Sequence, residues 1–175
     1  MMERILSVIV NDRPGVLARV AGLFSRRGFN IESITVGSAE EPTYSRMTIV
    51  SHGDDAMAQQ MVVQLMKLVD VIDVHDISRE KVVSRELALI KVRIAKETRM
   101  EISHILEPFR VSIVDVGHTS MSVEVTGDTE KVDALIGLLS PYGVLAIART
   151  GVTALVRSGI SEADSYDERQ TAWPM

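Results

Sequence analysis

The fold of this chain is decided at the stretch Asn11-Asp12-Arg13-Pro14-Gly15-Val16-Leu17, where a first apolar run gives way to an amphipathic one. Residues 4–10 before it are nearly continuously apolar and rich in β-branched side chains, which is typical of a central strand. Residues 16–27 after it carry their apolar side chains at helical spacing, and Gly28 follows as a helix-ending glycine. Pro14 suits the first turn of a helix, and Gly15 permits a close approach of backbone or ligand. The stretch therefore predicts a strand, a tight turn and a helix.

The start of that helix admits two interpretations. The backbone amides of Gly15, Val16 and Leu17 would lie at a helix N-terminus without intrahelical acceptors, and such an end attracts a carboxylate or a phosphate. Alternatively, Asp12 simply caps the helix by accepting a hydrogen bond from the amide of Gly15. The local residues leave both interpretations open.

The remainder of the first 78 residues continues this pattern. Residues 30–36 alternate as a half-exposed strand, 37–43 form a turn region, and 44–51 form a third strand paired with the second as a hairpin. Gly53-Asp54-Asp55 opens a second helix with an Asp as its N-cap, and 71–77 is a fourth strand. The order β-α-β-β-α-β predicts a ferredoxin-like domain over 1–78, with both helices on one face of a four-stranded antiparallel sheet.

The same order of elements recurs after a charged segment, 79–86, which we expect to be a linker. Its second copy, over 87–157, predicts an α+β protein of two tandem ferredoxin-like βαββαβ domains. Glu107-Pro108 implies a kink or an early stop in its first helix. The polar, acidic residues 158–175 are expected to be a disordered tail, in which Trp173 is either a docking anchor or a loose residue. The elements of the second copy are strands at 87–95, 111–116, 120–126 and 143–149, and helices at 98–110 and after Gly127-Asp128.

Composition excludes several classes of protein. The net charge of −5 and the lack of aromatic residues on the central strands argue against an RNA-binding module. The chain has no Cys, so it has neither disulfides nor thiolate chemistry. No apolar run approaches the ~20 residues of a membrane span, and no signal peptide is recognisable, so we expect a cytoplasmic protein. The four histidines are widely separated, and no nucleophile–base pair or metal motif occurs, so we expect a non-catalytic chain without a metal site.

At this point the residues carry a family resemblance. The string I-L-S-V-I-V-N-D-R-P-G-V-L-A-R-V-A-G-L-F-S-R-R-G-F-N-I-E-S-I-T-V, residues 5–36, resembles the ACT domain of the small, regulatory subunit of acetolactate synthase (acetohydroxyacid synthase). Three later strings resemble further segments of that family, and the likeness extends over about residues 3–157. These strings are 45–49 (S-R-M-T-I), 67–71 (K-L-V-D-V) and 148–151 (A-R-T-G).

The resemblance implies a regulatory chain that makes no product. Such a chain binds the large catalytic subunit, raises its activity and confers feedback inhibition by valine or another branched-chain amino acid. Thiamine diphosphate, Mg and FAD are expected on the catalytic subunit only, with no cofactor in this chain. The ACT domain is expected to form a homodimer, with the effector between the Pro-Gly turn of one chain and the second strand of the other.

The residues of the turn and of the second strand suit such a site chemically. The free amides of Gly15, Val16 and Leu17 suit a carboxylate, and Asn11, Asp12 or Asn30 can accept hydrogen bonds from an ammonium group. Leu17, Ile31 and Ile34 are candidates for the apolar wall, unless Leu17 points into the core. The expected effector-binding residues are Asn11, Asp12, Pro14, Gly15, Val16, Leu17, Asn30, Ile31 and Ile34.

The sequence is also compatible with two other functions. One is a free-standing ACT-type amino-acid sensor that regulates a different enzyme. The other is a small enzyme on a ferredoxin-like scaffold, which the lack of an acid–base pair argues against. A pull-down distinguishes the free-standing sensor from the regulatory subunit, because recovery of a large thiamine-diphosphate enzyme would argue against the sensor.

Overall fold

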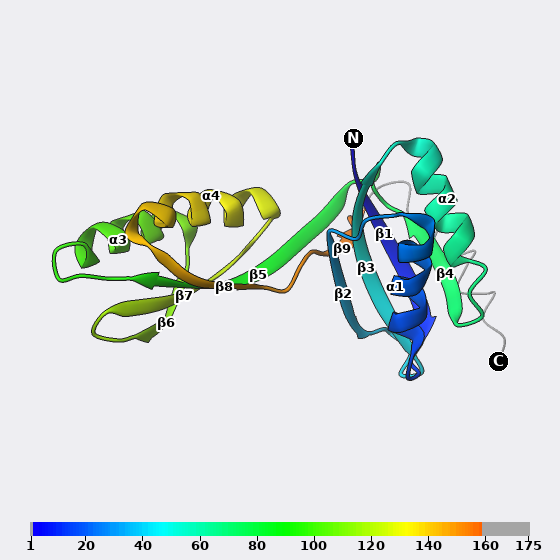
Figure 1. The fold of residues 1–175 in the computed structure, drawn as a ribbon, viewed down its shortest axis with the longest axis horizontal. Coiled ribbons are helices and arrows are strands. Elements are labelled where there is room, and N and C mark those ends of the chain that lie inside the picture. Colours follow the sequence, from blue (N-terminus) through cyan, green and yellow to red (C-terminus); the bar gives the residue numbers. More distant parts are fainter. Residues whose placement is uncertain (1, 159–175) are drawn as a thin grey trace.

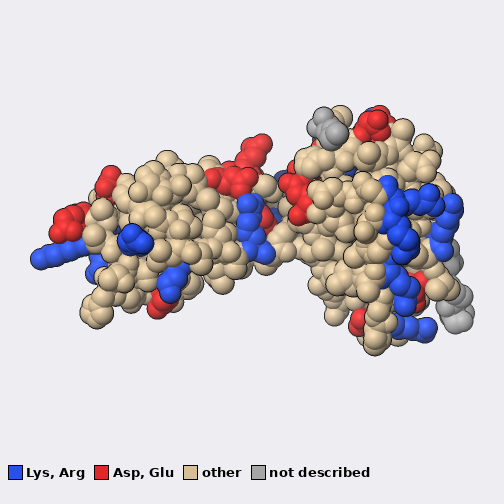
Figure 2. Space-filling model, viewed as in Figure 1, with Lys and Arg blue, Asp and Glu red and all other residues tan. Residues whose placement is uncertain are grey.

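The computed structural model describes residues 2–158 and consists of two lobes joined by a narrow waist (Figures 1 and 2). The N-terminal lobe contains four strands and two helices in the predicted β-α-β-β-α-β order. Its elements are β1 (Met2–Asn11), α1 (Val16–Arg27), β2 (Ser33–Ser38), β3 (Tyr44–Gly53), α2 (Asp55–Leu65) and β4 (Val71–Asp76).

The C-terminal lobe repeats this order and adds one strand. Two short 3₁₀ turns, η1 (Glu107–Phe109) and η2 (Ser140–Tyr142), extend its helices. Its other elements are β5 (Val82–Arg93), α3 (Arg99–Leu106), β6 (Ser112–Val116), β7 (Ser120–Gly127), α4 (Thr129–Leu139), β8 (Val144–Arg149) and β9 (Thr153–Val156). The prediction of two tandem βαββαβ units is confirmed.

Both sheets are antiparallel, and each has its first strand in an inner position. The strand order is β2-β3-β1-β4 in the N-terminal sheet and β6-β7-β5-β8 in the C-terminal sheet. Each sheet packs one face against its two helices, so the lobes have separate apolar cores. In the first core, alternate residues of β1 (Leu6, Val8 and Val10) pack with Val20 and Phe24 of α1, and none of the five is more than 1% exposed.

Local sequence signals account for most of the element ends. The side chain of Asp54 accepts a hydrogen bond from the amide of Met57 at 2.8 Å, which confirms the predicted Asp N-cap of α2. Asp128 caps α4 in the same way, accepting from the amide of Lys131 at 2.9 Å. Gly28 ends α1 in the left-handed region at φ 69°. Pro108 lies in η1, directly after α3, and the early stop predicted there is confirmed.

The expected linker over 79–86 is wrong in its second half, because β5 begins at Val82. The first four residues of β5, Val82–Arg85, pair with β9 to form a two-stranded antiparallel ribbon. We call this ribbon, together with Gly151 and Val152, which lead into β9, the strap. Figure 1 shows β5 running from one lobe into the other and β9 lying beside the N-terminal sheet. Residues 82–85 lack a strong apolar period because only one side of this short ribbon packs against the rest of the molecule. Their pairing partners lie about 70 positions later in the chain. The strap was therefore not visible in the local sequence.

The predicted acidic tail at 158–175 and Trp173 lie outside the described residues, apart from the exposed Ser158. Within residues 2–158, no helix is long and apolar enough to cross a membrane.

Candidate functional site

The Pro-Gly turn lies where β1 ends and α1 begins. The amide of Asp12 donates to the carbonyl of Thr43 at 2.9 Å, and the amide of Arg13 donates to the carbonyl of Asn11 at 3.0 Å. Gly15 then takes φ 87°, a left-handed conformation that favours glycine, and serves as the N-cap residue. The helix begins at Val16, so Pro14 precedes the helix rather than occupying its first turn.

The prediction that Asp12 caps α1 is wrong. A capping side chain belongs to the residue just before the first helical position, and that residue is Gly15, which has no side chain to accept a bond. Asp12 stands three residues earlier and is exposed. The turn through Pro14 shifts the helix start beyond the reach of an Asp12 cap.

The absence of a side-chain cap leaves backbone donors unused. The amide of Val16 donates to the carbonyl of Arg13 at 3.3 Å, so one of the three amides expected to be free is engaged. Among the described residues, no acceptor pairs with the amides of Gly15, Leu17 or Ala18. These three donors, together with the helix dipole, favour an anionic group at the turn.

Arg19 reinforces this preference, and the sequence reasoning did not single it out. A methyl carbon placed on Gly15 would lie 3.3 Å from Nη1 of Arg19, so the guanidinium lies over the turn. Nη2 of Arg19 lies 2.7 Å from Oδ2 of Asp70, a buried residue just before β4. No donor among the described residues makes a well-aligned hydrogen bond to that oxygen, so the pair is held by charge. The sequence did contain a signal for this placement, namely the spacing between Gly15 and Arg19. A helical side chain points back toward the N-terminal end of its helix, so a residue at position 19 lies near the turn.

The surface around α1 is basic although the whole chain is acidic. Figure 2 shows Lys and Arg side chains gathered over the part of the N-terminal lobe where α1 lies. The helix carries Arg19, Arg26 and Arg27, all exposed, and no acidic residue. Of these three, Arg19 lies at the turn, whereas Arg26 and Arg27 lie in the last turn of the helix.

A shallow cavity of about 490 Å³ adjoins the turn on the side of the β2–β3 connection. Its walls include two predicted site residues, Asn11 and Asp12, and four that the sequence reasoning missed: Arg13, Pro42, Thr43 and Tyr44. The hydrogen bond from Asp12 to Thr43 brings these two segments together. Carbonyl and carboxylate oxygens at this cavity can accept hydrogen bonds from an ammonium group.

The structure separates the predicted site residues into two groups. Asn11, Asp12, Pro14, Gly15, Val16 and Leu17 lie together at the start of α1, where Val16 is buried in the core and Leu17 is 47% exposed. Asn30, Ile31 and Ile34 follow the other end of that helix. The helix has 12 residues, which at 1.5 Å per residue is about 18 Å. One protomer alone therefore cannot bring Asn30 and Ile31 together with the turn around a small molecule. Ile34 lies nearer, level with Leu6 of β1, four residues before Val10.

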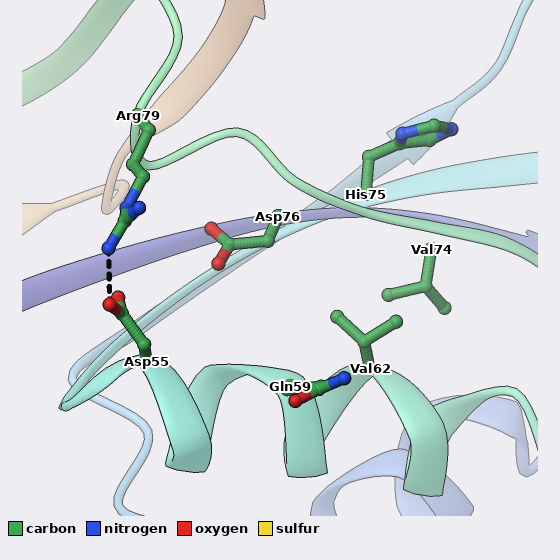
Figure 3. Close-up of a pocket in the computed structure, with 7 residues that line it drawn as sticks. All are labelled: Asp55, Gln59, Val62, Val74, His75, Asp76 and Arg79. Atoms are coloured by element: carbon green, nitrogen blue, oxygen red, sulfur yellow. Dashed lines mark hydrogen bonds and ion pairs between the residues drawn. The ribbon is translucent and has the colours of Figure 1, made fainter.

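A second cavity, of about 430 Å³, lies between α2 and β4 (Figure 3). Its charged groups already serve the fold: Asp55 at the start of α2 binds both the buried Arg4 and Arg79. Hydrogen bonds from Arg4, and then from Arg79, hold the pKa of Asp55 below its ordinary value. Asp76 accepts a hydrogen bond from the amide of Ser78 at 3.0 Å. This arrangement is typical of a structural ion-pair cluster rather than a ligand site.

The histidines lie apart from one another. His75 contacts Asp73 at 2.9 Å, His104 lies 3.8 Å from Glu107, and His52 contacts Glu32. In the part of the chain that the structure describes, no three His, Cys, Asp or Glu residues are grouped as metal ligands would be.

Comparison with known proteins covers both lobes. Residues 6–73 match the family described as the AHAS small subunit-like ACT domain, and residues 85–158 match the family described as the small subunit of acetolactate synthase. The acetolactate synthase small subunit of Bacillus subtilis is 50% identical over 165 residues, which is 94% of this chain and 96% of that protein. A probable acetolactate synthase small subunit of Archaeoglobus fulgidus is 52% identical over 156 residues, covering 89% of this chain and 98% of that protein.

A solved structure agrees with these matches over the whole fold. The crystal structure of the acetolactate synthase small subunit from Thermotoga maritima superimposes with a TM-score of 0.85 at 45% identity, covering 91% of this chain and all of that one. The strap and both lobes lie within residues 2–158, the part described here. The chain therefore belongs to the family of acetolactate synthase small subunits, with an N-terminal ACT domain.

Proposed function

We propose that this chain activates the large catalytic subunit of acetolactate synthase and confers feedback inhibition by a branched-chain amino acid, with valine as the first candidate. The supporting observation is the split of the site residues between the two ends of α1, which an ACT homodimer would reunite. The chemistry of synthesis, with its thiamine diphosphate, Mg and FAD, would belong to the large subunit.

The strand register supports such a dimer. β2 is an edge strand that pairs only with β3 among the described strands. Its first residue, Ser33, is level with Val50, and its last, Ser38, is level with Ser45, which in turn pairs with Val10 near the Pro-Gly turn. If two copies of β2 pair antiparallel about a two-fold axis, the start of one strand lies beside the end of the other. The Asn30–Ile31 segment of one protomer then lies at the same end as the Pro-Gly turn of its partner.

In that arrangement each chemical group of the effector has a partner. The carboxylate would accept hydrogen bonds from the amides of Gly15 and Leu17 near the Arg19 guanidinium. The ammonium group would donate to Asn11 or Asp12 of the same protomer, or to Asn30 of the other. The branched side chain would pack against Ile31 and Ile34 of the other protomer, beside the exposed Leu17.

The expected affinity suits a metabolite sensor. A helix end offers a carboxylate roughly 0.3–2 kcal/mol. Burial of an isopropyl group adds about 1.5–3 kcal/mol, and each charge-assisted hydrogen bond adds about 1.5–3 kcal/mol. After the costs of association, these contributions correspond to a Kd of roughly micromolar to millimolar.

Calorimetric titration with valine, leucine, isoleucine and alanine, on the chain alone and with its catalytic subunit, tests this proposal. Gly15→Asp places a like charge where the effector carboxylate would lie, so we expect binding to weaken by roughly two orders of magnitude, which is about 2.7 kcal/mol. Activation of the catalytic subunit should persist in this variant while inhibition disappears.

Gly143→Asp is the matched control. Gly143 also has a positive φ, 93°, and its nearest neighbour to an added Cβ is the Cβ of Arg93 at 3.8 Å, so the substitution carries similar backbone strain far from the turn. Unchanged valine inhibition in Gly15→Asp, or failure of the wild-type complex to bind any branched-chain amino acid, would refute the proposal.

A further inference from the structure

The strap is a packed part of the N-terminal lobe rather than a loose connection. Val152 and Ala154 on its inner side are 8% and 1% exposed, and they pack against Ile5 of β1 and Val50 of β3. This contact lies on the face of the N-terminal sheet opposite to the helices, because Leu6 and Ile49, the next residues in register, point into the helix-covered core. The strap therefore packs on the face of the ACT sheet that the helices leave uncovered.

Side chains of β2 bind the strap directly. The hydroxyl of Thr35 donates to the carbonyl of Val152 at 3.0 Å, and the amide of Val152 donates to the hydroxyl of Ser33 at 3.5 Å. Gly151, at φ 84°, lies so close that an added Cβ would be 3.1 Å from the Cβ of Ser33. A displacement of β2 would therefore also displace residues 151–152.

The strap is in turn joined firmly to the C-terminal lobe. Thr150 donates from its amide to the carbonyl of Leu87 at 3.0 Å, and its hydroxyl accepts from the amide of Leu87 at 3.1 Å. Beside them, the buried Glu86 accepts two hydrogen bonds from Arg149. The other strand of the strap is the start of β5, which continues without a break into the C-terminal sheet. A change in how the strap packs on the N-terminal sheet therefore changes the placement of the whole C-terminal lobe.

The opposite face of β2 belongs to the proposed effector site. Ser33 and Thr35 alternate with Ile34, and successive side chains of a strand point to opposite faces. Ile34 and Ile31 lie against the helix-covered core, on the side expected to contact the effector. Among the strands of this sheet, β2 therefore joins the proposed effector site on one face to the strap on the other.

We propose that Ser33 and Thr35 couple the effector site to the C-terminal lobe through the strap. This inference rests on the proposed function and deepens it. Effector bound against Ile31 and Ile34 holds β2 in one of two positions. The Thr35–Val152 and Ser33–Val152 contacts convert that position into one placement of the C-terminal lobe. The effector shifts this equilibrium only by its different affinity for the two placements, and the shift is lost when β2 and the strap are uncoupled.

The test uses the full chain with its catalytic subunit. Thr35→Val keeps the shape and strand propensity of the side chain but removes the hydroxyl donor. We expect valine to bind with a Kd within about threefold of the wild type, while the ratio of inhibited to uninhibited complex at saturating valine falls by a factor of about 2–10, as for one lost hydrogen bond. In hydrogen exchange, valine should change the protection of the β9 amides in the wild type and not in the variant.

Gly151→Ala provides a second variant, since its added carbon pushes the strap away from Ser33 and should weaken inhibition in the same direction. Thr126→Val is the matched control: Thr126 is an exposed strand residue of β7 in the other lobe, and inhibition should stay unchanged. Full inhibition in both test variants, or loss of valine binding in Thr35→Val, overturns the coupling role. Failure of the wild type to bind any branched-chain amino acid refutes instead the proposed function itself.

Discussion

The contact of Glu86 with Arg149 at the waist gives the sharpest stability prediction. The side chain of Glu86 is 3% exposed and accepts from Nε of Arg149 at 3.1 Å and from its Nη2, while Nη1 of Arg149 binds Asp133 of α4 at 2.7 Å. The hydrogen bond with Glu86, and then that with Asp133, raise the pKa of Arg149 above its ordinary value, against the opposing effect of burial. Replacing the arginine by Met leaves a buried carboxylate without its partner.

The expected cost follows from this burial. Breaking a buried, hydrogen-bonded ion pair by removing one partner costs about 3–5 kcal/mol. Arg149 is 33% exposed, so solvent screens part of the interaction, and we expect Arg149→Met to lower the free energy of unfolding by about 2–4 kcal/mol. For a chain of this size, that corresponds to a fall in Tm of roughly 5–15 °C. Glu86→Met in addition should recover about 1–3 kcal/mol, because the double variant leaves no buried charge unpaired.

Urea and thermal unfolding, followed by circular dichroism, measure all four members of this double-mutant cycle. Hydrogen exchange of the β5 and β8 amides assigns the loss to the waist even if the two lobes unfold separately. Arg93→Met serves as a control, since Arg93 is exposed on β5 and should change stability by less than about 0.5 kcal/mol. An Arg149→Met variant as stable as this control, or strictly additive effects in the cycle, would refute the reasoning.

Two further predictions concern the N-terminal lobe. Asp55→Asn should lower the urea midpoint at pH 7, because the pKa of Asp55 is held below its ordinary value by Arg4 and then Arg79. This stabilisation is present above the unfolded pKa, near 3.9, and is lost as the pH falls through the lower folded pKa. The difference between wild type and variant should therefore shrink toward pH 2.5, and a constant difference would contradict it. Asp12→Asn should leave the stability within about 0.5 kcal/mol, since Asp12 does not cap α1. The same change should weaken valine binding about fivefold by removing a charge from the ammonium contact; a destabilised variant with unaltered affinity would reverse both assignments.

Signals that act within a few residues were read correctly from the sequence. Asp54 and Asp128 cap their helices because each cap joins residues three positions apart. Gly28 ends α1 for a similarly local reason, since only a residue tolerant of positive φ closes the helix in this way. The order of strands and helices, and with it the ferredoxin-like topology of both lobes, follows from such local patterns.

The turn at Gly15 shows where local reasoning ends. The sequence indicated a turn with free amides, but the exact helix start depends on the hydrogen bond of Asp12 to Thr43, which lies on another strand. The placement of Arg19 beside that turn likewise depends on Asp70, more than 50 residues away in the chain.

By itself, the sequence determined the two βαββαβ units, the Asp cap of α2, the Gly28 stop of α1 and the family to which the chain is similar, because apolar periodicity and capping act over one or two turns of chain. Only the tertiary structure decided that 82–85 form a strand with β9, that the strap lies on the ACT sheet, and that Arg19 lies over the turn beside Asp70. These features depend on contacts between residues about 50 to 70 positions apart. No local pattern encodes such contacts, since each partner has an ordinary sequence on its own.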